Sequence, residues 1–577
     1  MNLPTLNRRE ERLSFRAQVA RFRSKETFLG AAFVCLVLVF VVYHQSLDFQ
    51  FILDDHRFTA DPRIQESGHV WDYFANFVWA QFNGGPPSFY RPLFLLWMRT
   101  NFLLSGLSPW GWHLLSIAKH ALVAALLGLL VWKLLRDSTA ALVAATLFAL
   151  HPAQTESVSW VTVPDPLMSA GILLSLLSFL RYLEPVSMRY QARGKKPRTS
   201  RAASVPANDR KWLAISVCAY FLALLAKETA VVFPAVIFAV SLESRAREAA
   251  ERGRSTSGQA SAGRWALAFA KTAPFLFATG VYLLMRLSAL GGKLGASTEH
   301  LPWSTVILSW PSILCFYLKA MLWPAKSHSF ADPILVSRFS VREVLLPLLG
   351  LLLAAAILAA GLRWMSKKAA SELDHEAYAR LKTSLIAATL LLILPLVPAL
   401  NLNALNPGDF LHGRYTYLPL AGLMLLLAAG WRMARGPRLV FLCAACALAT
   451  GFSILTLEQE KQWESDATVF SIAHELAPRN VPVGRNLADT RVMAGLELHE
   501  QGRCAEALPI FEQVTREFPG DWYAWAGLGD CYVEQNDLIK GEDSLHRAVD
   551  ISHDPALTEH WQELRRHMGL SKSDRGK

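Results

Sequence analysis

Long apolar runs recur along most of this 577-residue chain, and they constrain its fold more than any other feature. The first run extends from Phe28 to Tyr43, and comparable runs continue as far as Leu457. The chain is 52% hydrophobic and only 18% charged, which is too apolar for a soluble protein of this size. The sequence therefore predicts an all-α, polytopic membrane protein.

The distribution of basic residues predicts the orientation of these runs. The first 27 residues form a basic tail, and two further basic loops lie near 189–211 and 245–264. Because Lys and Arg gather on the cytoplasmic side, we expect the N-terminus and both loops inside. The first run lacks a small-residue cleavage site and is long, so we interpret it as a signal anchor in the inner (plasma) membrane.

We predict eleven transmembrane helices on this basis, with the N-terminus inside and the C-terminus on the outer, periplasmic face. The segment from Ser304 to Trp323 is apolar but is not counted, because counting it would place the basic residues near 363–368 outside. We expect it to be re-entrant or interfacial. The predicted spans cover residues 28–43, 112–135, 139–150, 165–181, 212–226, 230–242, 265–290, 344–362, 383–400, 415–431 and 439–457.

After residue 457 the composition becomes that of soluble helices. Pro478, Pro519 and Pro555 recur at roughly the tetratricopeptide period, which predicts a helical-repeat domain over 458–577. The predicted domains are thus a tail (1–27), a membrane module (28–457) with an outer loop at 44–109, and the repeats. Antiparallel packing would bring Cys504 and Cys531 together, so either a disulfide or two unpaired core thiols is expected there.

Several function classes find no support in the sequence. The net charge of +11 comes from grouped basic loops that lack interleaved aromatic residues, which argues against nucleic-acid binding. There is no Walker loop, no glycine-rich dinucleotide motif and no zinc-type Cys/His spacing. We expect no metal and no cofactor.

Ionisable residues collect at the span ends that are predicted to lie outside. A carboxylate can accept a proton from an incoming hydroxyl, and Arg or Lys can stabilise a departing phosphate. Nucleotide sugars and ATP are absent outside, so a polyprenyl-phosphate sugar is the expected donor. The clustered residues are Asp54, Asp55, Arg91, His151, Glu156, Asp165, Lys227, Glu228, His412, Arg414 and Tyr415.

Structural roles are the alternative for several of these residues. Arg91 and Lys227 can extend to lipid headgroups, and Arg414 can anchor a helix at the interface. His151 precedes Pro152 and can simply end a span. Asp165 precedes Pro166, a pattern typical of a helix start.

The order of motifs resembles the transmembrane and tetratricopeptide-repeat protein O-mannosyltransferases and their bacterial relatives, within the GT-C superfamily. The matching pieces, spread over nearly the whole chain, are Leu53-Asp54-Asp55, Tyr90-Arg91-Pro92-Leu93, Phe148 to Pro152 with Thr155-Glu156, Ala226-Lys227-Glu228, Arg414-Tyr415 with Tyr417-Leu418-Pro419, and Trp463 before the repeats. The chain departs from the family pattern between Gly291 and Arg338 and in its short repeat array.

This resemblance implies an inverting, metal-independent transfer of a sugar, with a mannose-type hexose favoured, to Ser or Thr hydroxyls of exported proteins. It implies that Asp54 or Asp55 is the base, with Asp54 preferred, and that Arg414 binds the donor phosphate with help from Arg91 or Lys227. The remaining clustered residues would shape the substrate pocket: His151, Glu156, Asp165, Glu228, His412 and Tyr415. Repeats on the outer face favour a polypeptide acceptor.

Two other classes stay open. One is a GT-C transferase that acts on a glycolipid or an envelope polysaccharide. The other is a non-catalytic repeat-bearing scaffold or a transporter, although a transporter should carry ionisable residues at mid-span rather than at span ends.

Overall fold

The computed structural model describes residues 30, 33–82, 89–184, 207–251, 258–292, 300–325, 334–405, 411–434, 436 and 438–570. The predicted basic tail and much of the first basic loop lie outside the described residues. The chain divides into two compact units, Met1–Ser329 with Ile334–Glu464, and Phe330–Pro333 with Ser465–Lys577. No described residue forms a strand, so the all-α prediction is confirmed.

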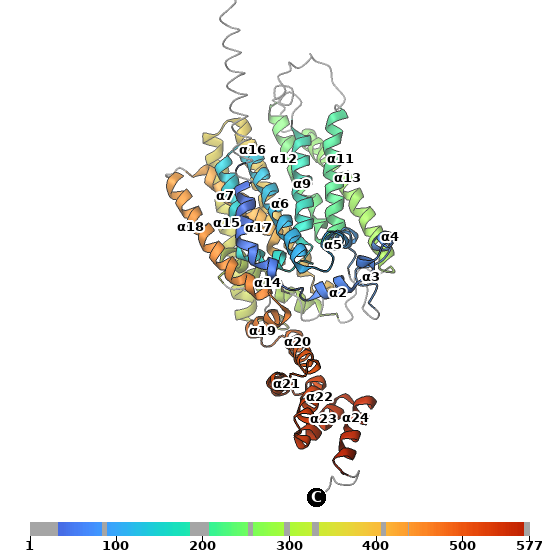
Figure 1. The fold of residues 1–577 in the computed structure, drawn as a ribbon. Helices are drawn as coiled ribbons and strands as arrows, with labels where there is room; N and C mark the ends of the chain where they lie inside the picture. Colours follow the sequence, from blue (N-terminus) through green and yellow to red (C-terminus); the bar gives the residue numbers. More distant parts are fainter. Residues whose placement is uncertain are drawn as a thin grey trace, which may run out of the picture. The chain divides into compact units, whose positions relative to one another are not determined.

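The first unit is a bundle of long helices with short helices at one end (Figure 1). A helix over 33–43 leads into η1 (His44–Asp48), and the elements up to the first basic loop are α2 (Asp54–Ala60), α3 (Pro62–Gln65), α4 (Val70–Ala75), α5 (Pro92–Ser105), α6 (Pro109–Leu135), α7 (Ser138–Ala149), η2 (Pro152–Gln154), α8 (Thr155–Ser159) and α9 (Asp165–Leu183). The later elements are α11 (Ala207–Ala226), η3 (Glu228–Val232), α12 (Phe233–Glu251), α13 (Gly258–Ala289), α14 (Trp303–Leu322), η4 (Val341–Leu345), α15 (Leu346–Glu372), α16 (His375–Ile393), η5 (Leu394–Leu396), η6 (Pro398–Leu400), η7 (Leu402–Ala404), η8 (Gly413–Thr416), α17 (Tyr417–Met433), α18 (Arg438–Glu460) and η9 (Lys461–Trp463).

Each of the eleven predicted spans is helical over nearly all of its described residues, although some, such as 230–242 and 383–400, combine an α-helix with short 3-10 helices. Among those residues, eight helices are long and apolar enough to cross a membrane, and two shorter apolar helices cover 33–48 and 138–149. The prediction of a polytopic membrane protein is therefore confirmed, whereas the number of eleven spans stays a prediction.

Small residues allow the long helices of the bundle to approach closely. Gly171 of α9 faces Ala223 of α11, where an added Cβ would lie 2.9 Å from the Ala223 side chain. Across the same contact, Ser175 and Ser216 each donate a hydrogen bond to the other's carbonyl oxygen at 2.7 Å. Such contacts between small and hydroxylated residues are how helices associate where no water drives them together.

The C-termini of α7, α16 and α18 lie at one end of the bundle. We call it the cavity end, because the cavity described below lies there. Helix α14 lies along this end. Leu301, just before α14, exchanges backbone hydrogen bonds with the Asn403 side chain, and Trp310 donates to the Leu400 carbonyl after α16. Near its other end, the Met321 carbonyl contacts His151 after α7 at 3.1 Å. Both ends of α14 thus meet the same end of the bundle. Because α14 is also long and apolar enough to cross a membrane, the expectation that it is re-entrant or interfacial stays a prediction.

The segment between η1 and α6 folds as a small core of its own at the cavity end. Phe58, Tyr73, Phe94 and Trp112 are among its buried residues. Buried Arg63 pairs with Asp61 at 2.7 Å and donates to the carbonyls of Phe77 and Val78. Helix α5 begins at Pro92, because proline suits the first helical turn. This core holds α2, and with it the acidic pair, in place.

The second unit consists of paired antiparallel helices (Figure 1). They are α19 (Asp466–Leu476), α20 (Val481–Glu500), α21 (Cys504–Glu517), α22 (Trp522–Glu534), α23 (Leu538–Ser552) and α24 (Pro555–His567). Phe511 fills their centre, because Gly495 and Gly527 leave room for its ring. A disulfide joins Cys504 to Cys531, with Cα atoms 5.2 Å apart, so the bonded alternative is the one present.

Candidate functional site

A cavity of about 330 Å³ lies at the cavity end of the first unit. Seven charged side chains line it, five cationic and two acidic, so its lining is net positive. The charged lining residues are Asp54, Arg57, Arg91, Lys227, Glu228, Arg286 and Arg414, and aromatic rings of Trp79, Phe89, Trp160 and Tyr415 lie among them. Segments far apart in sequence meet here, as the placement of sequential span ends predicts.

The structure separates the two members of the acidic pair. Asp54 lines the cavity, whereas Asp55 is fully buried behind it. The Asp55 carboxylate accepts hydrogen bonds from the Thr162 hydroxyl at 2.7 Å, the Thr162 amide at 3.3 Å and the Ile52 amide at 3.1 Å. Asp55 therefore ties α2 to the segment between α8 and α9, and Asp54 is left as the member that a substrate can reach.

Burial raises the pKa of Asp55 from its ordinary value to about 7, although the hydrogen bonds from Thr162 and Ile52 oppose the shift. The residue before the pair is also unusual. Leu53 has φ 53° and ψ −124°, a conformation that costs a non-glycine residue on the order of 1–3 kcal/mol. Backbone strain beside a carboxylate that lines a cavity, as Asp54 does, is typical of functional sites.

Arg91 and Glu228 form a bidentate pair on the cavity wall. Arg91 Nε and Nη2 donate to the two Glu228 oxygens at 2.9 and 2.6 Å. Burial disfavours the Glu228 charge, but Arg91 outweighs it and lowers the pKa of Glu228 to about 2. The pair fixes the Arg91 guanidinium in one orientation. The central guanidinium carbon, Cζ, also lies 4.3 Å from the centre of the Phe89 ring.

Lys227 is held by Asp165 from behind the cavity. Its Nζ donates to both Asp165 oxygens, at 2.7 and 2.6 Å, and lies 4.9 Å from the centre of the Tyr415 ring. Burial lowers the pKa of Lys227, and the nearby Asp165 carboxylate opposes this shift. Asp165, at the start of α9, is thus the counterion of a cavity-lining lysine.

Glu156 supports Arg414 in the same way. Its carboxylate accepts a hydrogen bond from the Arg414 amide at 3.0 Å and lies 3.4 Å from the Arg414 guanidinium. His412 Nδ1 is 3.2 Å from the same carboxylate. The Arg414 guanidinium lies over the Trp160 ring, 4.8 Å from its centre. Glu156 and His412 are buried behind the cavity, and Arg414 lines it.

His151 does not line the cavity. Its ring is fully buried, contacts the Met321 carbonyl and the Ala153 amide, and packs edge-on against Phe452 at 4.6 Å. These contacts join the end of α7 to α14 and α18, so the alternative structural role is the one that the contacts support.

Four residues at or behind the cavity were missed from the sequence. Arg57 directly follows the acidic pair, and Arg286 lies in the last turn of α13, at the predicted outer end of a span. Trp160 stacks with Trp463 and lies under Arg414. Lys119, behind the cavity in α6, bonds the Val163 carbonyl at 3.3 Å. A lysine within a predominantly apolar span is itself a functional signal, which could have found Lys119.

The arrangement suits an anionic ligand that reacts with a hydroxyl. Five cations line the cavity, and carboxylates hold three of them, Arg91, Lys227 and Arg414, so these can stabilise negative charge without reorganising. A carboxylate that lines the same cavity can take a proton. Among the residues that the structure describes, the one group of three or more side chains spaced to hold a metal ion lies in the second unit.

The fold and this site define an all-helical polytopic membrane protein with a cation-lined cavity and a C-terminal helical-repeat domain. Residues 498–566 match the tetratricopeptide repeat, which confirms the repeat prediction.

Among curated proteins, the chain is 25% identical to human protein O-mannosyl-transferase TMTC3, over 89% of this chain and 54% of that protein. It is 33% identical to protein O-mannosyl-transferase Tmtc2 of Drosophila melanogaster, over 34% of this chain and 20% of that protein. The resemblance inferred from the motifs is thereby confirmed. The chain spans about half the length of the first of these relatives.

Among solved structures, the oligosaccharyltransferase of Archaeoglobus fulgidus in its apo form aligns with a TM-score of 0.39 and 13% identity. The alignment covers 80% of this chain and 59% of that one.

Proposed function

We propose that this chain is a membrane glycosyltransferase that moves a hexose, mannose-type by preference, from a polyprenyl-phosphate donor to Ser or Thr hydroxyls of exported proteins. One observation carries the proposal. Asp54 and five cationic side chains line a single cavity, so a base and a phosphate site lie within reach of one substrate complex. The names of the curated relatives support the same reaction class.

In the proposed reaction, the acceptor oxygen attacks the anomeric carbon on the face opposite the phosphate. Asp54 accepts the hydroxyl proton as the new C–O bond forms, which activates the nucleophile. The bond from the anomeric carbon to the phosphate oxygen breaks, and its electron pair leaves with the polyprenyl phosphate. Attack from the opposite face inverts the anomeric configuration.

The cations supply what the departing phosphate needs in this mechanism. Arg414 is the leading phosphate ligand, because Glu156 and Trp160 hold its guanidinium at the cavity wall. Lys227 and Arg91 are similarly oriented by Asp165 and Glu228. Side chains of fixed positive charge can take the role that a divalent ion has in other phosphate sites, so the proposed reaction is metal-independent.

The acceptor is the less constrained half of the proposal. A tetratricopeptide domain is a protein-binding module, which favours a polypeptide acceptor. With eleven spans and a cytoplasmic N-terminus, the repeats would lie on the outer, periplasmic face, where exported proteins pass. A glycolipid or polysaccharide acceptor is the second candidate, and a non-catalytic scaffold is the third.

Glycoproteomics of exported proteins tests the proposal. Strains would carry the wild-type chain, a deletion, Asp54→Asn, or Asp72→Asn, a control carboxylate of the same outer loop that pairs with His69. We expect hexose on Ser or Thr in the wild type and the control, and its loss in the deletion and Asp54→Asn. Unchanged glycoproteins with altered envelope lipid or polysaccharide would support the second candidate, and no change in either class would support the scaffold.

A further inference from the structure

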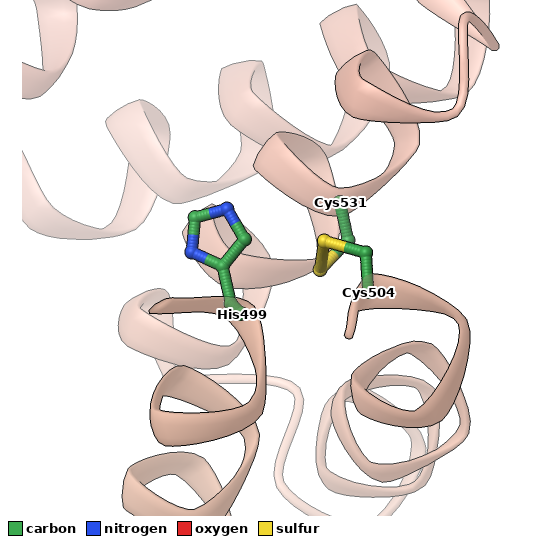
Figure 2. Close-up of side chains that lie close together, drawn as sticks. All are labelled: His499, Cys504 and Cys531. Atoms are coloured by element: carbon green, nitrogen blue, oxygen red, sulfur yellow. A yellow bond between two sulfur atoms is a disulfide. The ribbon is translucent and has the colours of Figure 1, made fainter. Parts of the chain in front are cut away.

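The packing of the second unit brings together four side chains that can ligate a metal ion. His499, Cys504 and Cys531 place their ligand atoms within 4.8 Å of one another (Figure 2). Glu534 completes the group, with one carboxylate oxygen 2.9 Å from His499 Nε2 and the other 3.1 Å from Cys504 Sγ. None of the four belongs to the cavity of the first unit.

The distances fit a tetrahedral zinc site after small side-chain adjustments. Zinc bonds of about 2.0–2.3 Å imply ligand atoms roughly 3.3–3.8 Å apart. The nitrogen and sulfur ligand atoms lie within 4.8 Å of one another, and the two Glu534 oxygens lie 2.9 Å from His499 Nε2 and 3.1 Å from Cys504 Sγ. Reduction of the disulfide and small side-chain rotations would bring these atoms to the separation that zinc requires. Two thiolates, an imidazole and a carboxylate are also a donor set that zinc accepts.

The helices supply the ligands as two short-range pairs. His499 lies in the last turn of α20 and Cys504 is the first residue of α21, so one pair flanks a single tight turn. Cys531 and Glu534 are three residues apart at the end of α22, on one face of that helix. Two pairs of ligands, each closely spaced in sequence, are typical of a structural zinc site.

Access to this group is from one side. Cys504 and Cys531 are buried, whereas the His499 and Glu534 side chains are 23% and 50% exposed. An ion can therefore approach through the imidazole and carboxylate and reach the sulfur atoms beneath them.

We propose that His499, Cys504, Cys531 and Glu534 bind one zinc ion when the two cysteines are reduced, and that the Cys504–Cys531 disulfide is the alternative, metal-free state. Binding of zinc releases two thiol protons. A small-molecule disulfide can then take two electrons from the two thiolates. The Cys504–Cys531 bond forms, the zinc ion leaves, and the oxidant becomes two thiols with two protons from water.

The two states connect different helices. The disulfide joins α21 to α22, whereas the zinc ion would also include α20 through His499. The redox state of the pair would thus decide whether the cross-link within the packed repeat helices includes two helices or three. This proposal does not depend on the proposed glycosyltransferase activity.

Zinc content of the full-length chain in detergent tests the proposal. The protein would be reduced with a phosphine, its thiols counted by maleimide mass-tagging, equilibrated with zinc and desalted. We expect about one zinc per chain in the reduced protein and its release on treatment with glutathione disulfide. Cys504→Ser/Cys531→Ser should bind none, and Cys443→Ser/Cys446→Ser, which removes another closely spaced pair in α18, should bind as the wild type does.

Glu534 has its own test. Glu534→Gln should weaken zinc binding at least about tenfold in chelator competition and leave disulfide formation intact. Glu517→Gln, which removes a carboxylate that pairs with Arg491 instead, is the matched control. Equal zinc in the reduced wild type and Cys504→Ser/Cys531→Ser, or a disulfide that the phosphine cannot reduce, would overturn the proposal. Unchanged affinity in Glu534→Gln would overturn the four-ligand site.

Discussion

Asp165 holds Lys227 across 62 residues of sequence, through two hydrogen bonds of 2.7 and 2.6 Å between buried side chains. Asp165 is the first residue of α9, and Lys227 is the residue that connects α11 to η3. Because the ammonium group also lines the cavity, this pair links the stability of the bundle to the charge of the site.

Breaking this pair on one side should destabilise the protein strongly. Asp165→Leu would leave Lys227 as an uncompensated buried charge, at a cost of roughly 3–5 kcal/mol. The double variant Asp165→Leu/Lys227→Met should recover most of this loss but not the transfer activity, because the cavity then lacks one cation. Thermal unfolding in detergent and a transfer assay measure the two effects. Equal stability of the single and double variants would contradict the assigned pairing.

Substitutions of Asp54 and Asp55 should have different effects, one on activity and the other on stability. Asp54→Asn should reduce transfer by at least 100-fold with little change in thermal stability, because a general base contributes about 10²–10⁴-fold. Asp55→Asn should instead alter stability, since Asp55 holds Thr162 and Ile52. Transfer rates and unfolding temperatures of both variants distinguish the roles. Full activity in both would refute the assignment of the site.

Asp55 should also give the protein a pH-dependent stability. The pKa of Asp55 is about 7 in the folded chain and about 3.9 when unfolded. Between these values the folded state holds a proton that the unfolded state has released, so stability falls as pH rises from about 4 to 7 and levels off above. The unfolding temperature of the wild type, relative to Asp55→Asn, should therefore decrease between pH 5 and pH 8. A difference that is constant over this range would contradict the buried position of the carboxyl group.

Arg414 should matter more than Arg91 for the donor. Glu228 engages both Nε and Nη2 of Arg91, at 2.9 and 2.6 Å, whereas the Arg414 guanidinium lies farther from its carboxylate, 3.4 Å from Glu156, and over the Trp160 ring. Loss of a charge-assisted hydrogen bond costs about 1.5–3 kcal/mol, so Arg414→Ala should raise the donor KM roughly 10- to 100-fold. Arg91→Ala should have the smaller effect. Overlapping donor saturation curves for the two variants and the wild type would argue against this ranking.

The packing of α16 on α17 offers a matched pair of glycine substitutions. A Cβ at Gly422 would lie 2.5 Å from the Leu392 amide nitrogen, whereas a Cβ at Gly430 of the same helix meets nothing within 4 Å. Gly422→Ala should therefore destabilise the protein by about 1–3 kcal/mol, and Gly430→Ala should be neutral or slightly stabilising. Unfolding temperatures of the two variants test this, and equal values would contradict the close approach of the two helices.

The sequence predicted most accurately those features that depend on a single local physical property, such as hydropathy or charge. Apolar length and basic loops predicted the helices at their observed positions, and the proline period predicted the repeats. The same rules placed Asp54, Arg91, Lys227, Glu228, Arg414 and Tyr415 at one end of the bundle, where all six line one cavity.

Sequence alone could not separate neighbours with similar chemistry. Asp54 and Asp55 are adjacent carboxylates, yet the turn at Leu53 directs one to the cavity and the other to Thr162. Histidine is a common residue in functional sites, but the His151 ring instead packs between the end of α7, α14 and α18.

What the sequence determined by itself is the class of fold and the end of the bundle where ionisable groups gather, because helix length, periodicity and charge distribution are local properties. Tertiary structure alone decided which carboxylate meets which cation. It also brought His499 and Glu534 beside the two cysteines. Pairings such as Asp165 with Lys227 depend on how distant helices pack, and no local rule contains that information.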